Sequence, residues 1–180
     1  MARTETEKSR MKSLLIAWHS RTGAAEQMAR ALARGAAQTA RELEQAADLR
    51  VDLRPARSVQ AADLLACDGY LFCAPENLGG LSGEMKELFD RCYYGALERI
   101  EGRPYALAIS AGTDGAGAVR QAERICTGWR LRAVAPALIE RSGAQTPAEI
   151  LAPKTVSADA LARCEELGGL LAATLLTGVE

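Results

Sequence analysis

Apolar strand-like runs and helix-like patterns alternate along almost the whole chain. The runs Leu14–Trp18 and Gly69–Cys73 are apolar on both faces, which is typical of strands buried inside a parallel sheet. Between such runs, apolar residues recur every three or four positions, as on one face of a helix. This alternation predicts βαβ units, and therefore an α/β domain whose sheet is covered by helices on both faces.

Five strands are predicted, in a doubly wound parallel sheet with the order 2-1-3-4-5. They are Leu14–Trp18, Val51–Leu53, Gly69–Cys73, Pro104–Ser110 and Leu131–Ala135, the last of which could resume at Ala137–Ile139. Helices are expected from about Ala24 into the forties, over 58–66, from a cap at Ser82, over 116–129 and from a cap at Ser157. A capping box at Thr146–Glu149 predicts one more short helix, which Pro153 ends.

Bulk properties exclude several classes of protein. The 180 residues fit a single domain over 14–180, preceded by a polar tail over 1–13 that is expected to be flexible. A net charge of -1 and 4% aromatic residues argue against nucleic-acid binding. No run of 18 apolar residues occurs, so no membrane span is predicted.

The five cysteines and the single histidine do not suggest a metal centre. No Cys-x-x-Cys pair occurs, and a zinc site would need more histidine or closely spaced cysteine. Cys73 and Cys92 fall among apolar neighbours and are interpreted as buried free thiols. Free thiols fit a reducing compartment, so a cytoplasmic location is expected.

Two unusual loops follow strands 1 and 3, where a sheet of this order binds its ligands. The first is His19–Ala25, in which Ser20 and Thr22 offer hydroxyls, Arg21 offers charge and Gly23 permits close approach. Since the loop leads into a helix N-terminus, it can bind a phosphate. The alternative is a Ser/Thr helix cap without a ligand. No Gly-x-x-x-x-Gly-Lys-Ser/Thr or Gly-x-Gly-x-x-Gly is present, which argues against a nucleoside triphosphate or a dinucleotide.

The second loop, Ala74–Gly83, contains Gly79, Gly80 and Gly83, more glycine than a simple turn requires. A third loop over 110–117 follows strand 4, and its exposed backbone N–H groups could stabilise negative charge on a ligand. Asp114 is awkward for that role and is expected to cap the next helix instead. A helix-capping glycine turn is the alternative interpretation of this third loop.

The first and second loops resemble motifs of one family. The first resembles the Ser/Thr-x-Thr-Gly-x-Thr phosphate loop of flavodoxin-like proteins, except that Ala25 replaces a hydroxyl, a loss for which Arg21 could compensate. Residues 75–86 are similar to the Pro-x-x-x-Gly-x-x-Ser-Gly-x-x-Lys stretch of flavodoxin-like, FMN-dependent NAD(P)H oxidoreductases and quinone reductases. The resemblance extends from about Leu14 to Ile139, whereas 141–154 matches no pattern.

The resemblance implies a flavodoxin-like fold, bound FMN, NAD(P)H as the electron donor and a quinone-type small molecule as the acceptor. It also implies a homodimer or tetramer, and no catalytic side chain, because the flavin carries the chemistry. The cofactor-binding residues that it implies come from the three loops: Ser20, Arg21, Thr22, Gly23, Ala24, Ala25, Pro75, Glu76, Asn77, Leu78, Gly79, Gly80, Ser110, Ala111, Gly112, Thr113, Gly115 and Gly117.

Other functions remain open. A flavodoxin-like electron carrier would share the fold, but carriers usually cover the flavin ring with aromatic residues and have acidic surfaces. Asn77 and Leu78 supply no aromatic ring here, which favours the enzyme. A phosphorylation receiver and a small tyrosine phosphatase are disfavoured, since the acidic residues or the cysteine that they need are absent from these loops. His19 could contact a ligand, although a structural role is favoured.

Overall fold

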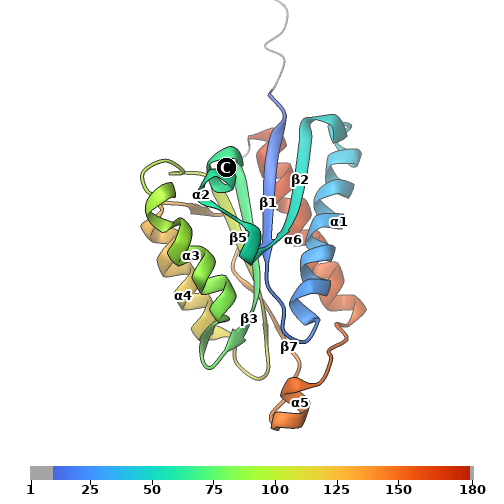
Figure 1. Ribbon diagram of the computed structural model, residues 1–180. Helices are drawn as coiled ribbons and strands as arrows, with labels where there is room; N and C mark the ends of the chain where they lie inside the picture. The colour runs from blue at the N-terminus through green and yellow to red at the C-terminus, as the bar shows by residue number, and fades with distance from the viewer. Residues whose placement is uncertain (1–9, 179–180) are drawn as a thin grey trace, which may run out of the picture.

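The computed structural model describes residues 10–178 and contains a central parallel sheet (Figure 1). Its main strands are in the order β2-β1-β3-β5-β6. Since β5 and β6 correspond to the fourth and fifth predicted strands, this confirms the predicted order 2-1-3-4-5. Within residues 10–178 the sheet has seven strands rather than five, because β4 was not predicted and the last strand resumes as a separate strand, close to the Ala137–Ile139 stretch where this was expected. The strands are β1 (Lys12–Trp18), β2 (Leu49–Pro55), β3 (Gly69–Asn77), β4 (Gly80–Leu81), β5 (Pro104–Ala111), β6 (Arg132–Ala133) and β7 (Leu138–Arg141).

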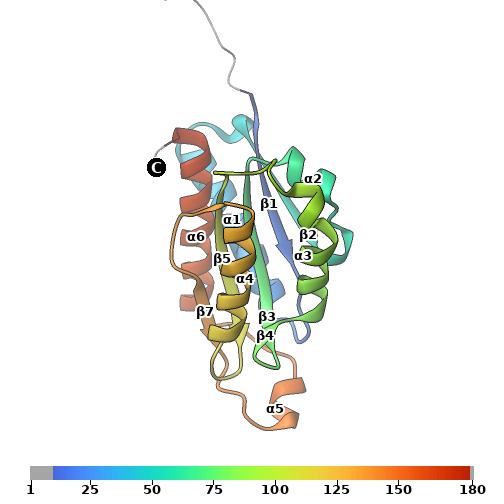
Figure 2. The ribbon, with the colours of Figure 1, turned by 90° about the vertical axis from the view of Figure 1, so that its left-hand side faces the viewer.

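Helices cover both faces of the sheet (Figure 2). Helices α1 (Ala24–Glu42) and α6 (Ala158–Thr177) lie on one face. The other face is covered by α2 (Ala61–Ala66), α3 (Gly83–Ala96) and α4 (Ala116–Gly128). The remaining elements are short: η1 (Ala46–Asp48), η2 (Ala56–Ser58) and α5 (Pro147–Leu151).

The apolar strands account for this layering. Along β1, Leu15 and Ala17 enter the cluster that contacts α3 and α4, whereas Leu14 and Ile16 enter the cluster that contacts α1 and α6. Successive side chains of a strand point to opposite faces, so a continuously apolar strand needs helices on both sides. The doubly wound fold follows from this pattern.

Three boundaries differ from the sequence expectations. Strand β1 begins at Lys12, so the domain starts inside the predicted tail, of which residues 1–9 lie outside the described part of the chain. The fifth strand is split into β6 and β7, both of which pair with β5. Pro136 lies between them, and a proline cannot donate a hydrogen bond to a sheet. Strand β3 runs on to Asn77 and turns back as β4.

Helices α1 and α6 approach each other through glycine. A Cβ atom on Gly35 would lie 1.9 Å from the carbonyl oxygen of Glu165, and one on Gly168 would lie 2.0 Å from that of Leu32. Either distance is far shorter than any real contact, so the two backbones can pack this closely only without side chains at these positions. Within residues 10–178, no helix is both long and apolar enough to cross a membrane.

Candidate functional site

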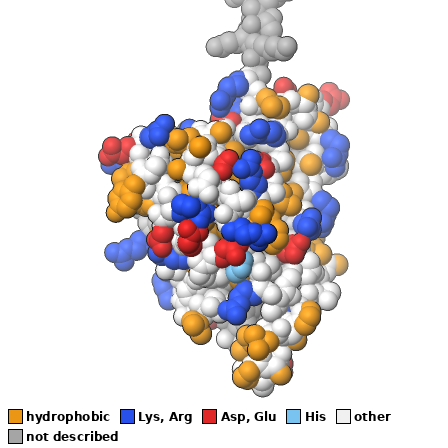
Figure 3. All heavy atoms as spheres, in the orientation of Figure 1, with side chains coloured by type: hydrophobic (Ala, Val, Ile, Leu, Met, Phe, Trp, Pro, Cys, Tyr) orange, Lys and Arg blue, Asp and Glu red, His pale blue; other side chains and the backbone are white. Residues whose placement is uncertain are grey.

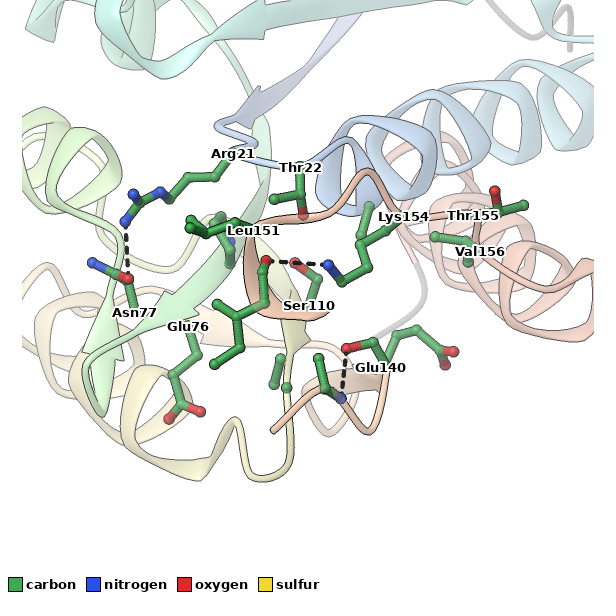
Figure 4. A pocket seen from close by; sticks show the side chains of 17 residues that line it. Arg21, Thr22, Glu76, Asn77, Ser110, Glu140, Leu151, Lys154, Thr155 and Val156 are labelled. Carbon is green, nitrogen blue, oxygen red and sulfur yellow. Dashed lines mark hydrogen bonds between the residues drawn. The ribbon is translucent and has the colours of Figure 1, made fainter. Parts of the chain in front are cut away.

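A cavity of about 280 Å³ opens at the carboxyl ends of β1, β3 and β5 (Figure 4). All three loops predicted from the sequence contribute to it. The predicted residues that line the cavity are Arg21, Thr22, Ala24, Pro75, Glu76, Asn77, Ser110, Ala111 and Gly112. The other predicted residues lie in the same loops but outside the lining: Ser20, Gly23, Ala25, Leu78, Gly79, Gly80, Thr113, Gly115 and Gly117.

The loop between β1 and α1 has the geometry of an anion site. Gly23 adopts a left-handed conformation with φ 96°, and its N–H donates to Ser20 Oγ at 3.1 Å. This arrangement turns the chain directly into α1, whose first N–H groups have no partner within the helix. Thr22 lies beside those groups and lines the cavity. The loop therefore combines N–H donors, a hydroxyl and the positive end of a helix.

The second loop is a β-hairpin rather than an irregular loop. Leu78 and Gly79 form its turn with φ 52° and 76°, as in a type I′ turn. The Leu78 side chain at the tip is 99% exposed. On the strand before the turn, Pro75, Glu76 and Asn77 line the cavity. The hairpin thus forms one wall of the cavity with its strand, while its glycines lie away from the lining.

Glu76 links the hairpin to the start of α4. Its Oε2 accepts a hydrogen bond from the Gly115 N–H at 2.6 Å, whereas its buried Oε1 has no partner among the described residues. Gly117 packs against the turn, since a Cβ there would lie 2.0 Å from Gly79 O and 3.1 Å from Glu76 Oε1. Gly117 therefore allows the hairpin and α4 to approach each other.

The loop after β5 contributes its first three residues, Ser110–Gly112, to the cavity. Beyond them, Asp114 Oδ1 accepts a hydrogen bond from the Ala116 N–H at 3.3 Å, in agreement with the capping role expected of Asp114. A Cβ on Gly112 would lie 2.9 Å from Ala144 O, so the chain after β7 crosses directly over this loop.

The remaining wall comes from the segment 140–156, to which the sequence assigned no function. It contributes Glu140, Ser142, Ala144, Ile150, Leu151, Lys154, Thr155 and Val156. The predicted capping box forms, with Glu149 N–H donating to Thr146 Oγ1 at 3.3 Å. This cap, placed just after the last strand, was the signal that could have located the segment at the carboxyl edge of the sheet.

Helix α5 presents apolar side chains at the edge of the cavity. Ile150 and Leu151 are 50% and 67% exposed. Figure 3 shows apolar side chains gathered at the lower end of the molecule, where Figure 1 places α5. The cavity therefore has an apolar rim where α5 borders it.

Two cations line the cavity, on different sides. Arg21 Nη1 donates to Asn77 Oδ1 at 3.0 Å, so its guanidinium bridges the first loop and the hairpin. Lys154 lies next to Thr22, because its backbone N–H donates to Thr22 O at 2.8 Å. In Figure 4, Arg21 extends toward Asn77, whereas Lys154 extends into the cavity on the side of Thr22. Positive charge in the cavity thus comes from Lys154 in the distant segment as well as from Arg21 in the first loop.

His19 does not line the cavity. Its Nδ1 forms a hydrogen bond with Ser82 Oγ at 2.8 Å, and its Nε2 lies 3.7 Å from Glu84 Oε2. Burial lowers the pKa of His19, and Arg21 and Arg57 add to this shift while Glu84 opposes it. The hydroxyl of Ser82 is used here and does not cap α3, whose first residue follows it. These contacts are those of a structural histidine, which joins the end of β1 to the start of α3.

The cysteines are all buried and reduced. Burial raises the pKa of Cys73 well above its ordinary value, and its thiol lies 3.2 Å from Ala25 O. A buried neutral thiol of this kind is unreactive. Within residues 10–178, no group of three or more histidine, cysteine or acidic side chains is arranged to hold a metal ion.

Comparison with known proteins identifies relatives. A family model described as NADPH-dependent FMN reductase matches residues 14–141. The match includes the three predicted loops and ends before most of the segment 140–156. No curated protein matches the chain.

Several solved structures share the fold. An archaeal flavodoxin superposes with a TM-score of 0.70 at 14% identity, covering 91% of this chain and 98% of its own. A flavodoxin described as WrbA-like, from Agrobacterium tumefaciens, gives 0.68 at 16% identity, with 92% and 98% covered. An oxidoreductase from Corynebacterium diphtheriae gives 0.69 at 18% identity, with 94% and 99% covered. At these identities the likeness establishes the flavodoxin-like fold alone.

Proposed function

The chain belongs to the NADPH-dependent FMN reductase family, and on this premise we propose that it binds FMN and transfers two electrons from NAD(P)H to a quinone-type acceptor. The observation that carries the proposal is the cavity in which a phosphate-type loop, a hairpin wall and an apolar rim meet. FMN needs these three features, since it joins a charged phosphate to a flat, largely apolar ring.

The residues present fit the phosphate of FMN. Thr22 supplies a hydroxyl and lies beside the free N–H groups at the start of α1. Gly23 allows the left-handed turn, with φ 96°, that carries the chain into α1. Ala25 cannot supply the third hydroxyl of the family motif, which removes about 1 kcal/mol of hydrogen bonding.

Other residues of the lining fit a flat ring. Pro75 and Ala111 offer apolar surface from β3 and β5, and Ile150 and Leu151 offer it from α5. Glu76 and Asn77 add polar groups for the edge of a ring. Among the described residues that line the cavity there is no histidine or cysteine, so this site is suited to chemistry that a cofactor carries.

FMN, when bound, supplies the redox chemistry: two electrons and a proton arrive as hydride from NAD(P)H and pass on to the acceptor. A quinone then becomes a quinol by taking up these two electrons, that proton and a second proton from solvent. The protein's residues bind and orient the reactants. The exposed side chains of Leu78, Ile150 and Leu151 offer apolar surface for a planar acceptor or for a second subunit of the proposed homodimer or tetramer.

An electron carrier is the second candidate, because flavodoxins share the fold. A carrier exchanges electrons with protein partners, whereas the proposed enzyme is reduced by a nicotinamide directly. Carriers usually cover the flavin ring with aromatic residues, whereas the hairpin of this chain has Asn77 and Leu78 there, which favours the enzyme. The two candidates therefore differ in one measurable property, direct reduction by NADPH or NADH.

Reconstitution with FMN is expected to give a stoichiometric flavoprotein with absorption bands near ~370 and ~450 nm, since these are properties of the cofactor. Anaerobic addition of NADPH or NADH should bleach the ~450 nm band, and a quinone should restore it. Stopped-flow absorbance measures both steps. Failure to bind FMN at micromolar concentrations would contradict the whole proposal. Binding without bleaching by either nicotinamide would instead support the electron carrier.

Thr22→Ala is expected to weaken FMN binding by about 1–3 kcal/mol, the range for a hydrogen bond to a charged group. Riboflavin affinity should hardly change, because riboflavin has no phosphate. Thr22→Ser keeps the hydroxyl and serves as the matched control. Titration by flavin fluorescence gives both dissociation constants, and equal losses for the two flavins would place Thr22 away from the phosphate.

A further inference from the structure

We propose that Lys154 supplies the positive charge that binds the phosphate of the ligand in this cavity. This inference rests on the proposed function for the identity of the ligand, and it extends that function to a residue outside the matched range 14–141. Lys154 follows α5, in the segment 140–156, far along the chain from the loop that leads into α1.

The backbone of Lys154 is held against that loop from both sides. Its N–H donates to Thr22 O at 2.8 Å, and its carbonyl accepts a hydrogen bond from Gln27 Nε2, also at 2.8 Å. The Gln27 side chain donates at the same time to Gly23 O at 2.9 Å and accepts from the Val156 N–H at 3.1 Å. Gln27 thereby joins the start of α1 to 154–156 and fixes Lys154 beside Thr22.

The ammonium group of Lys154 is held by backbone carbonyl oxygens, and its charge also acts on the exposed carboxylate of Glu149. Its Nζ donates to backbone carbonyl oxygens at the end of α5: Glu149 O at 2.6 Å, Ile150 O at 3.1 Å and Ala152 O at 2.6 Å. Within residues 10–178, Lys154 forms no ion pair. A phosphate dianion is a stronger acceptor than a carbonyl oxygen, so a rotation of the side chain alone can transfer this charge to a ligand.

The other charged groups in the lining point elsewhere or are paired. Arg21 is exposed and donates to Asn77 Oδ1, on the hairpin side. Glu140 is paired with Arg163 at 2.8 Å, and Glu76 accepts from Gly115. The side of the cavity at Thr22 therefore combines Lys154, whose ammonium group donates to carbonyl oxygens, with the helix N-terminus, while Glu76 lies on the hairpin side. This polarity orients a ligand with its phosphate toward α1.

The same placement accounts for the departure at Ala25. A charge-assisted hydrogen bond is about twice as strong as a neutral one, so one lysine offsets the missing third hydroxyl. Arg21, which the sequence favoured for this compensation, bridges toward the hairpin and acts on the ring side of the cavity.

The test compares FMN with riboflavin in wild-type protein and in variants. Lys154→Met keeps the aliphatic stem and removes the charge, so FMN affinity should fall roughly tenfold to a hundredfold, while riboflavin affinity stays within about twofold. Lys154→Arg keeps the charge and should retain most of the preference for FMN. Arg21→Met is the matched control for a cation elsewhere in the cavity, and it should affect the two flavins equally.

A second measurement needs no flavin. Inorganic phosphate should raise the melting temperature of the flavin-free wild-type protein above that in chloride of equal ionic strength, and it should not do so for Lys154→Met. If flavins fail to bind but this phosphate effect is present, the proposed function is wrong and the role of Lys154 stands. If Lys154→Met weakens the affinities for FMN and riboflavin equally, or changes neither, the proposed role of Lys154 is wrong. FMN binding by the wild-type protein would still support the proposed function.

Discussion

Gly168→Ala is expected to lower the free energy of unfolding by about 2–4 kcal/mol, although alanine normally favours a helix over glycine by about 1 kcal/mol. The added Cβ would lie 2.0 Å from Leu32 O and 2.8 Å from Leu32 C, both in the backbone of α1. A helix backbone cannot yield as a flexible side chain can, so α6 must move away from α1. That movement opens the core cluster over this face of the sheet.

Thermal unfolding followed by circular dichroism measures this effect. At about 2–4 °C per kcal/mol for a chain of this length, the melting temperature should fall by roughly 5–15 °C. Gly83→Ala is the matched control, because a Cβ at Gly83 would meet nothing within 4 Å. That variant should stay within about 0.5 kcal/mol of wild type. If Gly168→Ala melts at the same temperature as the wild-type protein, α1 and α6 do not pack as described.

Gly117→Ala is expected to damage the cavity more than any other single methyl group added around it. The new Cβ would lie 2.0 Å from Gly79 O, a backbone atom of the hairpin turn, and 3.1 Å from Glu76 Oε1. The hairpin must therefore move away from α4, and the hydrogen bond between Glu76 and Gly115 must lengthen. Glu76 and Asn77 line the cavity, so its hairpin wall moves with them.

The dissociation constants of FMN and riboflavin should both rise about tenfold or more, a cost of at least about 1.4 kcal/mol in each case. The two flavins are affected alike because the displaced wall lies away from Thr22 and Lys154. Gly83→Ala again serves as the control, since it adds the same methyl group at the start of the helix that follows the hairpin. Selective loss of FMN would contradict this assignment of the hairpin to the ring side.

Most of the fold could be predicted from local patterns. Strands such as Gly69–Cys73 are apolar on both faces, and this property alone requires helices on both sides of the sheet. The strand order was predicted from the doubly wound fold that the two loops indicate, and the structure confirms it. The resumption of the last strand beyond Pro136 was anticipated at Ala137–Ile139. The β-hairpin at Leu78 and Gly79 was missed, because it depends on a turn conformation rather than on periodicity.

The three loops of the candidate site were located for the same reason, since each follows the carboxyl end of a predicted strand. Which of their residues line the cavity was not predictable. Asn77 and Gly80 are both in the second loop, but only Asn77 lines the cavity, because β4 folds back on β3. The orientation of a side chain in a loop depends on the neighbouring loops, whose arrangement in space cannot be predicted from the sequence.

By itself, the sequence determined the α/β class, the positions of the main strands and the edge of the sheet at which the cavity opens. Those properties arise from hydrophobic periodicity and helix caps, which act over a few residues. Only the tertiary structure decided that the segment 140–156 completes the cavity and that Lys154 lies beside Thr22. Gln27 and Lys154 are 127 residues apart, and they meet because β7, α5 and α6 return the chain across the start of α1. A contact of that kind depends on the packed fold as a whole, and no local pattern encodes it.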